Sequence, residues 1–80
     1  MENYLNISGK SGVSKYEIGL DEIIVQFTDG AQYLYNYRST GRRNVERMKI
    51  LAIEGSGLNA YINSEVKFNY AKKIRGKMWA

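Results

Sequence analysis

The chain contains no cysteine, no histidine and no proline. Without cysteine it can form neither a disulfide nor a thiolate metal site. Without histidine it lacks the commonest general base and the commonest transition-metal ligand. Phosphate-binding glycine motifs are absent as well. We therefore expect a protein that is not an enzyme, uses no metal or cofactor, and acts by binding another molecule.

Long apolar runs are also missing. No stretch approaches the roughly 18 apolar residues of a membrane span, and the N-terminus does not resemble a secretion signal. A cytoplasmic location without a membrane partner is the resulting expectation. The 80 residues suffice for one small core, and a composition of 44% hydrophobic and 25% charged residues is typical of a globular protein.

Charge is unevenly distributed along the chain. Residues 1–37 carry five acidic and two basic side chains, a net charge of −3, whereas residues 38–80 carry ten basic and three acidic side chains, a net charge of +7. A basic half favours an anionic partner such as nucleic acid. The alternative is an ordinary solvated surface of basic helices.

Residues 1–12 read as a flexible N-terminal arm, because polar residues and glycines interrupt any periodicity there. A single domain is expected over residues 13–74, followed by a basic C-terminal tail at 75–80. Within the domain, alternation and β-branched or aromatic residues predict strands over 14–18, 22–28 and 31–37.

Asp29-Gly30 lies between the last two of these strands and is typical of a two-residue hairpin turn. That turn would pair Val25 with Leu34 and place them on one face of the sheet. This core face would hold Ile23, Val25, Phe27 and Leu34. The opposite face would hold Ile24, Gln26, Thr28, Tyr33, Tyr35 and Tyr37.

Apolar spacing of three and four residues predicts a main helix over 42–54, which Gly55 ends, and one or two short helices over 58–73. The expected fold is therefore α+β, with a three-stranded antiparallel β-meander followed by two or three α-helices packed on one face. Ile50 and Ile53 either extend the core or form a homodimer contact, and we favour the core.

The predicted row of tyrosines is the main candidate site. Aromatic rings on an open sheet can stack unpaired bases, and basic residues nearby can hold phosphates. The rings can equally well cover a second apolar layer beneath the N-terminal arm or a helix. The candidate nucleic-acid-binding residues are Tyr33, Tyr35, Tyr37, Arg38, Arg42, Arg43, Lys72, Lys73 and Arg75.

Several segments together resemble the KTSC domain, a family named for a C-terminal segment of some lysyl-tRNA synthetases and also found as a free-standing bacterial protein. The likeness runs from about Ser11 to Tyr70 and rests on residues 11–18, residues 24–30, Tyr33-Leu34-Tyr35 and residues 48–59. The resemblance implies a free-standing α+β domain and, through the synthetase link, RNA binding. Tyr70 would match a tyrosine in the family's terminal helix.

These observations lead to one functional hypothesis and one alternative. The hypothesis is a binding module for RNA or single-stranded nucleic acid, which uses the tyrosine face and the basic helical residues. The alternative is a protein-interaction or self-associating domain, which receives a partner or a second copy at an open sheet edge or at Ile50 and Ile53.

Overall fold

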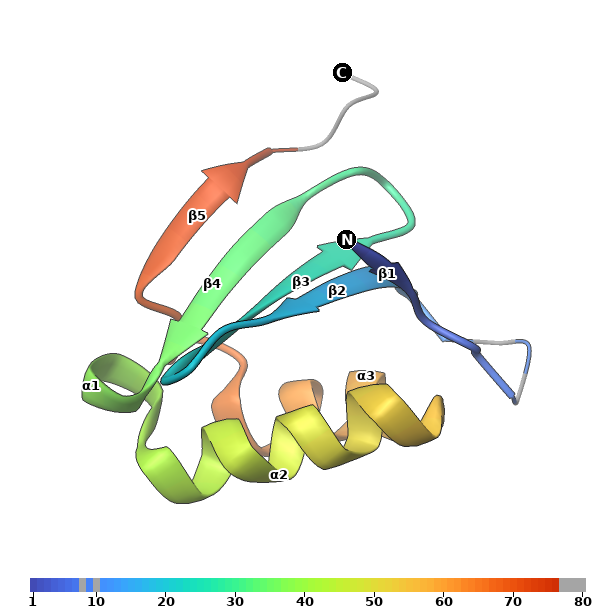
Figure 1. Ribbon diagram of the computed structural model, residues 1–80. Helices are drawn as coiled ribbons and strands as arrows, with labels where there is room; N and C mark the ends of the chain where they lie inside the picture. Colours follow the sequence, from blue (N-terminus) through green and yellow to red (C-terminus); the bar gives the residue numbers. More distant parts are fainter. Residues whose placement is uncertain (8, 10, 77–80) are drawn as a thin grey trace.

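The computed structural model describes residues 1–7, 9 and 11–76, which form an α+β fold with helices on one face of an antiparallel sheet (Figure 1). The five strands of this described part follow the order of the sequence: β1 (Glu2–Asn3), β2 (Val13–Ile18), β3 (Glu22–Phe27), β4 (Gln32–Asn36) and β5 (Lys72–Arg75). Its helices are α1 (Tyr37–Thr40), α2 (Arg42–Glu54) and α3 (Leu58–Tyr61), which continues into the π-helical η1 (Ile62–Val66). The α+β class is confirmed, but the described residues form five strands instead of the predicted three.

The turn between β3 and β4 contains three residues, not the predicted two. The Phe27 N–H donates to the Ala31 carbonyl at 2.8 Å, and the Gly30 N–H donates to the Phe27 carbonyl at 2.9 Å. Gly30 has φ +91°, the left-handed conformation that closes a three-residue hairpin loop. Asp29 stabilises the loop because its Oδ1 accepts a hydrogen bond from the Ala31 N–H at 3.0 Å. Thr28 is the third loop residue.

The extra loop residue shifts the pairing of β3 with β4 by one position, which turns every side chain of β4 to the other face. Val25 pairs with Tyr33, and Ile24 pairs with Leu34. The predicted faces are right for β3, whose Ile23 and Val25 are buried in the core, and wrong for β4. Tyr33 and Tyr35 share the helix-covered face with Val25, and Leu34 lies on the open face. The observed register places two aromatic rings over the core, which buries more apolar surface than one leucine would.

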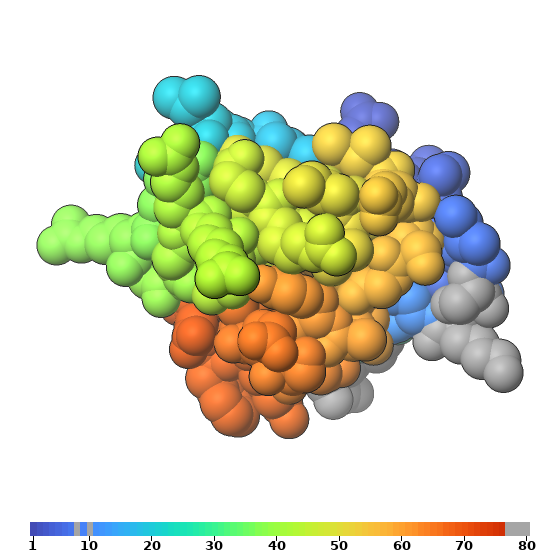
Figure 2. Space-filling view, turned by 90° about the horizontal axis from the view of Figure 1, so that it is seen from below, coloured from blue at the N-terminus to red at the C-terminus, as the bar shows by residue number. Residues whose placement is uncertain are grey.

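The core lies between the sheet and the helices. Seen from the helical side, α2 and the α3–η1 helix lie side by side over the sheet (Figure 2). α2 has the predicted bounds, but Ile50 and Ile53 are exposed on its outer side, so the expectation that they extend the core is wrong. The buried residues of the core are Tyr4, Val13, Ile23, Val25, Tyr35, Val45, Met48, Ala52, Leu58, Ile62 and Val66.

The N-terminal segment is part of the sheet at Glu2–Asn3, which pairs with β2. Tyr4 follows this strand and is buried, and its N–H donates to the Ser14 carbonyl at 2.9 Å. Its hydroxyl accepts a hydrogen bond from the Leu58 N–H at 3.2 Å, at the start of α3. The expected loose arm over 1–12 is therefore wrong for this segment, because a large aromatic side chain and a backbone ladder hold it in place.

The end of α2 is held against the same N-terminal segment. Gly55 ends the helix with φ +77°, and a Cβ at Gly55 would lie 2.5 Å from the Leu5 Cβ. The Ile7 N–H donates to the Gly55 carbonyl at 2.9 Å. Glycine is therefore required here both by the backbone conformation and by the close approach of Leu5.

The C-terminal part differs from the prediction of helix through residue 73. The helix ends at Val66, and Lys72–Arg75 forms β5 at the edge of the sheet beside β4. The Ala71 N–H leads into this pairing by donating to the Leu34 carbonyl at 2.7 Å. A short, lysine-rich edge strand is protected against pairing with other chains. Arg75 of the predicted basic tail thus belongs to the sheet, and residues 77–80 lie outside the described residues.

We expect Tyr4→Phe to lower the free energy of unfolding by about 1–3 kcal/mol, because it leaves the buried Leu58 N–H without its acceptor. The matched control is Tyr16→Phe, which removes a hydroxyl that has no hydrogen bond among the described residues and should change the stability by less than about 0.5 kcal/mol. Urea denaturation of both variants provides the measurement. Equal losses would show that the hydroxyl of Tyr4 does not anchor the N-terminal segment.

Candidate functional site

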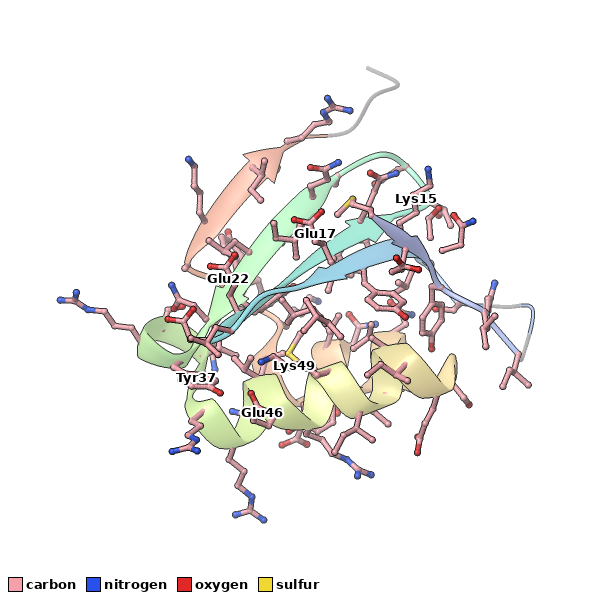
Figure 3. All side chains as sticks on the ribbon, viewed as in Figure 1. Lys15, Glu17, Glu22, Tyr37, Glu46 and Lys49 are labelled. Atoms are coloured by element: carbon pink, nitrogen blue, oxygen red, sulfur yellow. The ribbon has the colours of Figure 1, made fainter. Side chains whose placement is uncertain are left out.

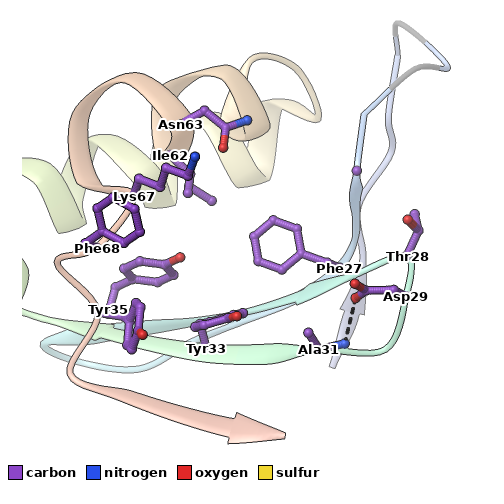
Figure 4. Close-up of a pocket in the computed structure, with 12 residues that line it drawn as sticks. Phe27, Thr28, Asp29, Ala31, Tyr33, Tyr35, Ile62, Asn63, Lys67 and Phe68 are labelled. Atoms are coloured by element: carbon purple, nitrogen blue, oxygen red, sulfur yellow. Dashed lines mark hydrogen bonds between the residues drawn. The ribbon is translucent and has the colours of Figure 1, made fainter. Parts of the chain in front are cut away.

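A cavity of about 390 Å³ lies between the β3–β4 hairpin and the helical side of the fold (Figure 4). The sheet and the hairpin form its floor and one end, and η1 with the segment after it forms the roof. A π-helical turn such as η1 occurs frequently at functional sites. The lining residues are Gly12, Phe27, Thr28, Asp29, Ala31, Tyr33, Tyr35, Ile62, Asn63, Lys67, Phe68 and Tyr70.

Aromatic rings form the floor of this pocket. The ring centroids of Phe27 and Tyr33 are 5.8 Å apart with an interplanar angle of 81°, and those of Tyr33 and Tyr70 are 4.8 Å apart at 64°. Tyr35 contacts Tyr70 edge to face, with centroids 6.5 Å apart. Edge-to-face pairs are favourable, so the rings hold one another in place. The floor of the pocket is therefore a set of aromatic rings packed edge to face.

Tyr35 places a polar group, its hydroxyl, in this aromatic floor. Its side chain is 1% exposed, and its hydroxyl has no hydrogen bond among the described residues. Among those residues no fully buried side-chain oxygen or nitrogen lacks a partner, so the small exposed area of Tyr35 includes its hydroxyl and faces the pocket. Burial raises the pKa of Tyr35, and the nearby Tyr33 and Tyr70 raise it further. The hydroxyl is therefore neutral and can both donate and accept a hydrogen bond.

Two ammonium groups lie beside the aromatic rings. The Nζ of Lys67 is 5.5 Å from the ring centroid of Phe68, and the Nζ of Lys73 is 5.8 Å from that of Tyr33. One carboxylate, that of Asp29, also lines the pocket, but one of its oxygens is held by the Ala31 N–H. The mouth of the pocket therefore combines cations with aromatic surface.

The structure does not keep the three predicted tyrosines in one row. Tyr33 and Tyr35 line the pocket, whereas Tyr37 begins α1 and donates a hydrogen bond from its hydroxyl to Glu46 Oε2 at 2.5 Å. The same carboxylate accepts Lys49 Nζ at 2.8 Å, and this ammonium also donates to the Leu20 carbonyl at 2.8 Å (Figure 3). Tyr37 therefore ties β4 to α2 and does not reach the pocket.

The predicted basic residues fall into two groups. Arg38, Arg42 and Arg43 belong to α1 and the start of α2, which follow the C-terminal end of β4. The pocket lining includes Thr28, Asp29 and Ala31 of the hairpin at the opposite end of β4, and none of these arginines lines it. Lys72, Lys73 and Arg75 are all in β5, and of these Lys73 lies over a ring of the pocket.

Several pocket residues were not predicted from the sequence, among them Phe27, Asn63 and Phe68. Phe27 belongs to the site because the three-residue turn puts it on the same face as Tyr33. That turn could have been considered from the sequence, since Gly30 at its third position is typical of three-residue hairpin loops as well. The roof residues carry no comparable signal, because their position depends on how η1 packs on the sheet.

No family model, curated protein or solved structure matches this chain. The likeness to the KTSC domain therefore rests on the sequence segments quoted above and stays a prediction. Within the described part of the chain, no helix is long and apolar enough to cross a membrane. Nor do the described Asp and Glu side chains form a group of three that could hold a metal ion.

The contact between Tyr37, Glu46 and Lys49 predicts a specific pH dependence of stability. Hydrogen bonds from Lys49 and Tyr37 lower the pKa of Glu46 below 4.5, and the bond to Glu46 raises the pKa of Tyr37 above 10.0. A carboxyl group with a lowered pKa stabilises the fold above its unfolded pKa, and this stabilisation is lost as the pH falls through the folded value. Tyr37 has the opposite sign, so its contribution is lost as the pH rises through its raised pKa.

We expect Glu46→Gln to reduce the loss of stability between about pH 5 and pH 3, because the variant has no carboxylate to protonate there. Urea denaturation at a series of pH values checks this. Glu54→Gln is the control, since it removes another carboxylate of α2 that has no ion pair or hydrogen bond among the described residues. An unchanged pH profile for Glu46→Gln would contradict the assignment.

Proposed function

We propose that this chain is a non-enzymatic binding module for RNA or single-stranded nucleic acid. The observation that carries the proposal is the aromatic pocket with Lys67 and Lys73 beside its rings. Proteins that bind single strands combine aromatic side chains, on which bases stack, with cations that follow the phosphates. RNA binding is also what the resemblance to the KTSC domain implies.

Phe68 supports this proposal as an exposed aromatic side chain at the mouth of the pocket. It is 79% exposed, a large apolar surface for a residue that contributes nothing to the core. Lys67 precedes it, and the Lys67 ammonium lies over its ring. A base that stacked on Phe68 would therefore have a cation beside it for the adjoining phosphate.

The proposed mode of binding differs from stacking along an open sheet face. Tyr35 is buried and Tyr37 is hydrogen-bonded to Glu46, so these rings do not offer a continuous exposed row. The open face of the sheet instead carries Ile24 and Leu34 among polar and charged side chains. Bases would contact the helix-covered side at the pocket, and the lysines of β5 would contact phosphates along the sheet edge.

We expect single-stranded RNA or DNA of about eight nucleotides to bind with an affinity that falls between about 50 and 200 mM salt, because bound lysines release counterions from the phosphates. Phe68→Ala should weaken binding by roughly 5- to 100-fold through the loss of one stacked base. Leu20→Ala is the matched control, because it truncates another exposed apolar side chain, between β2 and β3 and outside the pocket lining. Fluorescence anisotropy of labelled strands is the measurement, and absence of salt-sensitive binding at low salt would overturn the proposal.

Self-association is the second candidate function, and two exposed apolar residues of α2 support it. Ile50 and Ile53 lie three residues apart, so they share one face of the helix, on its outer side. Both side chains are exposed. Apolar groups gathered at one place on a surface are typical of contacts with another chain.

Under this second proposal, sedimentation should show a dimer whose population rises with protein concentration. Ile53→Lys should shift the equilibrium to monomer, because the contact would then bury an unpaired charge. A lysine is suited to this position, since the C-terminal end of a helix favours positive charge and the fold is retained. A monomer at every concentration tested would exclude self-association.

A further inference from the structure

The hydroxyl of Tyr35 belongs to an almost fully buried side chain and forms no hydrogen bond with the described residues. It lies in the pocket, in a side chain that is 1% exposed. The ring is buried, whereas the hydroxyl keeps a small accessible area that faces the pocket and has no protein partner there. Such a group points to a ligand whose polar atoms meet it inside the pocket.

The pocket has the size and shape for a small planar ligand. Its volume of about 390 Å³ is near the lower end of the range for small-molecule sites. Phe27, Tyr33 and Tyr70 form apolar walls at fixed angles to one another, which suits a flat ring that contacts one face and one edge. A flexible aliphatic ligand would need no such arrangement.

Charges beside the pocket favour an anionic ligand over a cationic one. The position of a bound cation over Tyr33 is already taken by Lys73, whose Nζ is 5.8 Å from the ring centroid. Lys67 adds a second ammonium at the roof. The carboxylate of Asp29 is turned in part to the Ala31 N–H, which it accepts at 3.0 Å. A planar ring that carries a negatively charged group outside the pocket fits these features.

From these features we infer that the pocket takes one unpaired nucleobase, whose polar edge meets the hydroxyl of Tyr35 while its phosphate lies beside Lys67. The inference rests on the proposed function and adds how the strand is held: one base inserts, and its neighbours stay outside. A phenol donates and accepts equally well, so Tyr35 can pair with polar edges of either kind. The pocket should therefore distinguish a base from its absence more strongly than one base from another.

Three ligands test this inference with the full chain: a single strand of about eight nucleotides, the same strand with one abasic site at successive positions, and adenosine monophosphate. We expect one abasic position to weaken binding roughly tenfold, which corresponds to the loss of an inserted base, and other positions to matter less. Adenosine monophosphate should bind and compete with the strand, because the base and its phosphate fill the same site.

Tyr35→Phe tests the role of the hydroxyl. It should weaken both adenosine monophosphate and the intact strand about fivefold, the usual effect of one lost hydrogen bond, and leave the strand with the critical abasic site unaffected. The free energy of unfolding of the unliganded variant should be equal to or above that of the native chain, because no hydrogen bond of the protein is lost. Tyr16→Phe, which removes a hydroxyl elsewhere on the sheet, should change neither quantity.

The possible outcomes separate this inference from the proposed function. Salt-sensitive binding of the strand that no abasic position and no Tyr35→Phe substitution weakens would overturn the inserted base and leave the proposed function in place. Binding of adenosine monophosphate without binding of the strand would support the pocket and overturn the proposed function. Absence of binding by all three ligands would overturn both.

Discussion

The three-residue turn between β3 and β4 sets the arrangement on which the rest of this structure depends. Gly30 at φ +91° lets Phe27 pair with Ala31, and this pairing fixes the register of the whole hairpin. Side chains alternate along a strand, so the register decides which ones face the helices. With Tyr33 and Tyr35 on that face, the sheet brings aromatic rings to the helices instead of to solvent, and the pocket forms between these rings and the η1 segment.

The segments near the two ends of the described chain add the outer strands of the sheet. Tyr4 enters the core and accepts the Leu58 N–H, which joins the first strand to the start of α3. β5 adds the last strand beside β4 and carries Lys73 to the ring of Tyr33. Segments that are about 70 residues apart in sequence therefore lie in one sheet. These two strands add stability to a domain of this size, because its core alone is small.

The sequence predicted local features better than distant ones. The α+β class, α2 with both its ends and a turn at Asp29-Gly30 follow from periodicity and from glycine at known positions. The register did not follow, because two- and three-residue loops both accept Asp-Gly and differ in what packs against the strands. β5 was missed since Lys72–Arg75 has no strand alternation of its own and pairs only because β4 offers an edge. Tyr33 and Tyr35, both predicted as candidate site residues, line the pocket, but the prediction assigned them to the wrong face of the sheet.

The burial of Tyr35 also changes what its side chain can do. On an open face, the ring would offer its π surface and its hydroxyl would be hydrated. In the observed structure the ring is buried in the core, and only the hydroxyl is accessible from the pocket. Because a hydrogen bond is stronger in a low-dielectric interior than at the surface, we expect a bond formed there to contribute more to binding than one on an open face. The same burial that excludes stacking on Tyr35 therefore leaves the hydroxyl as its point of contact with the proposed ligand.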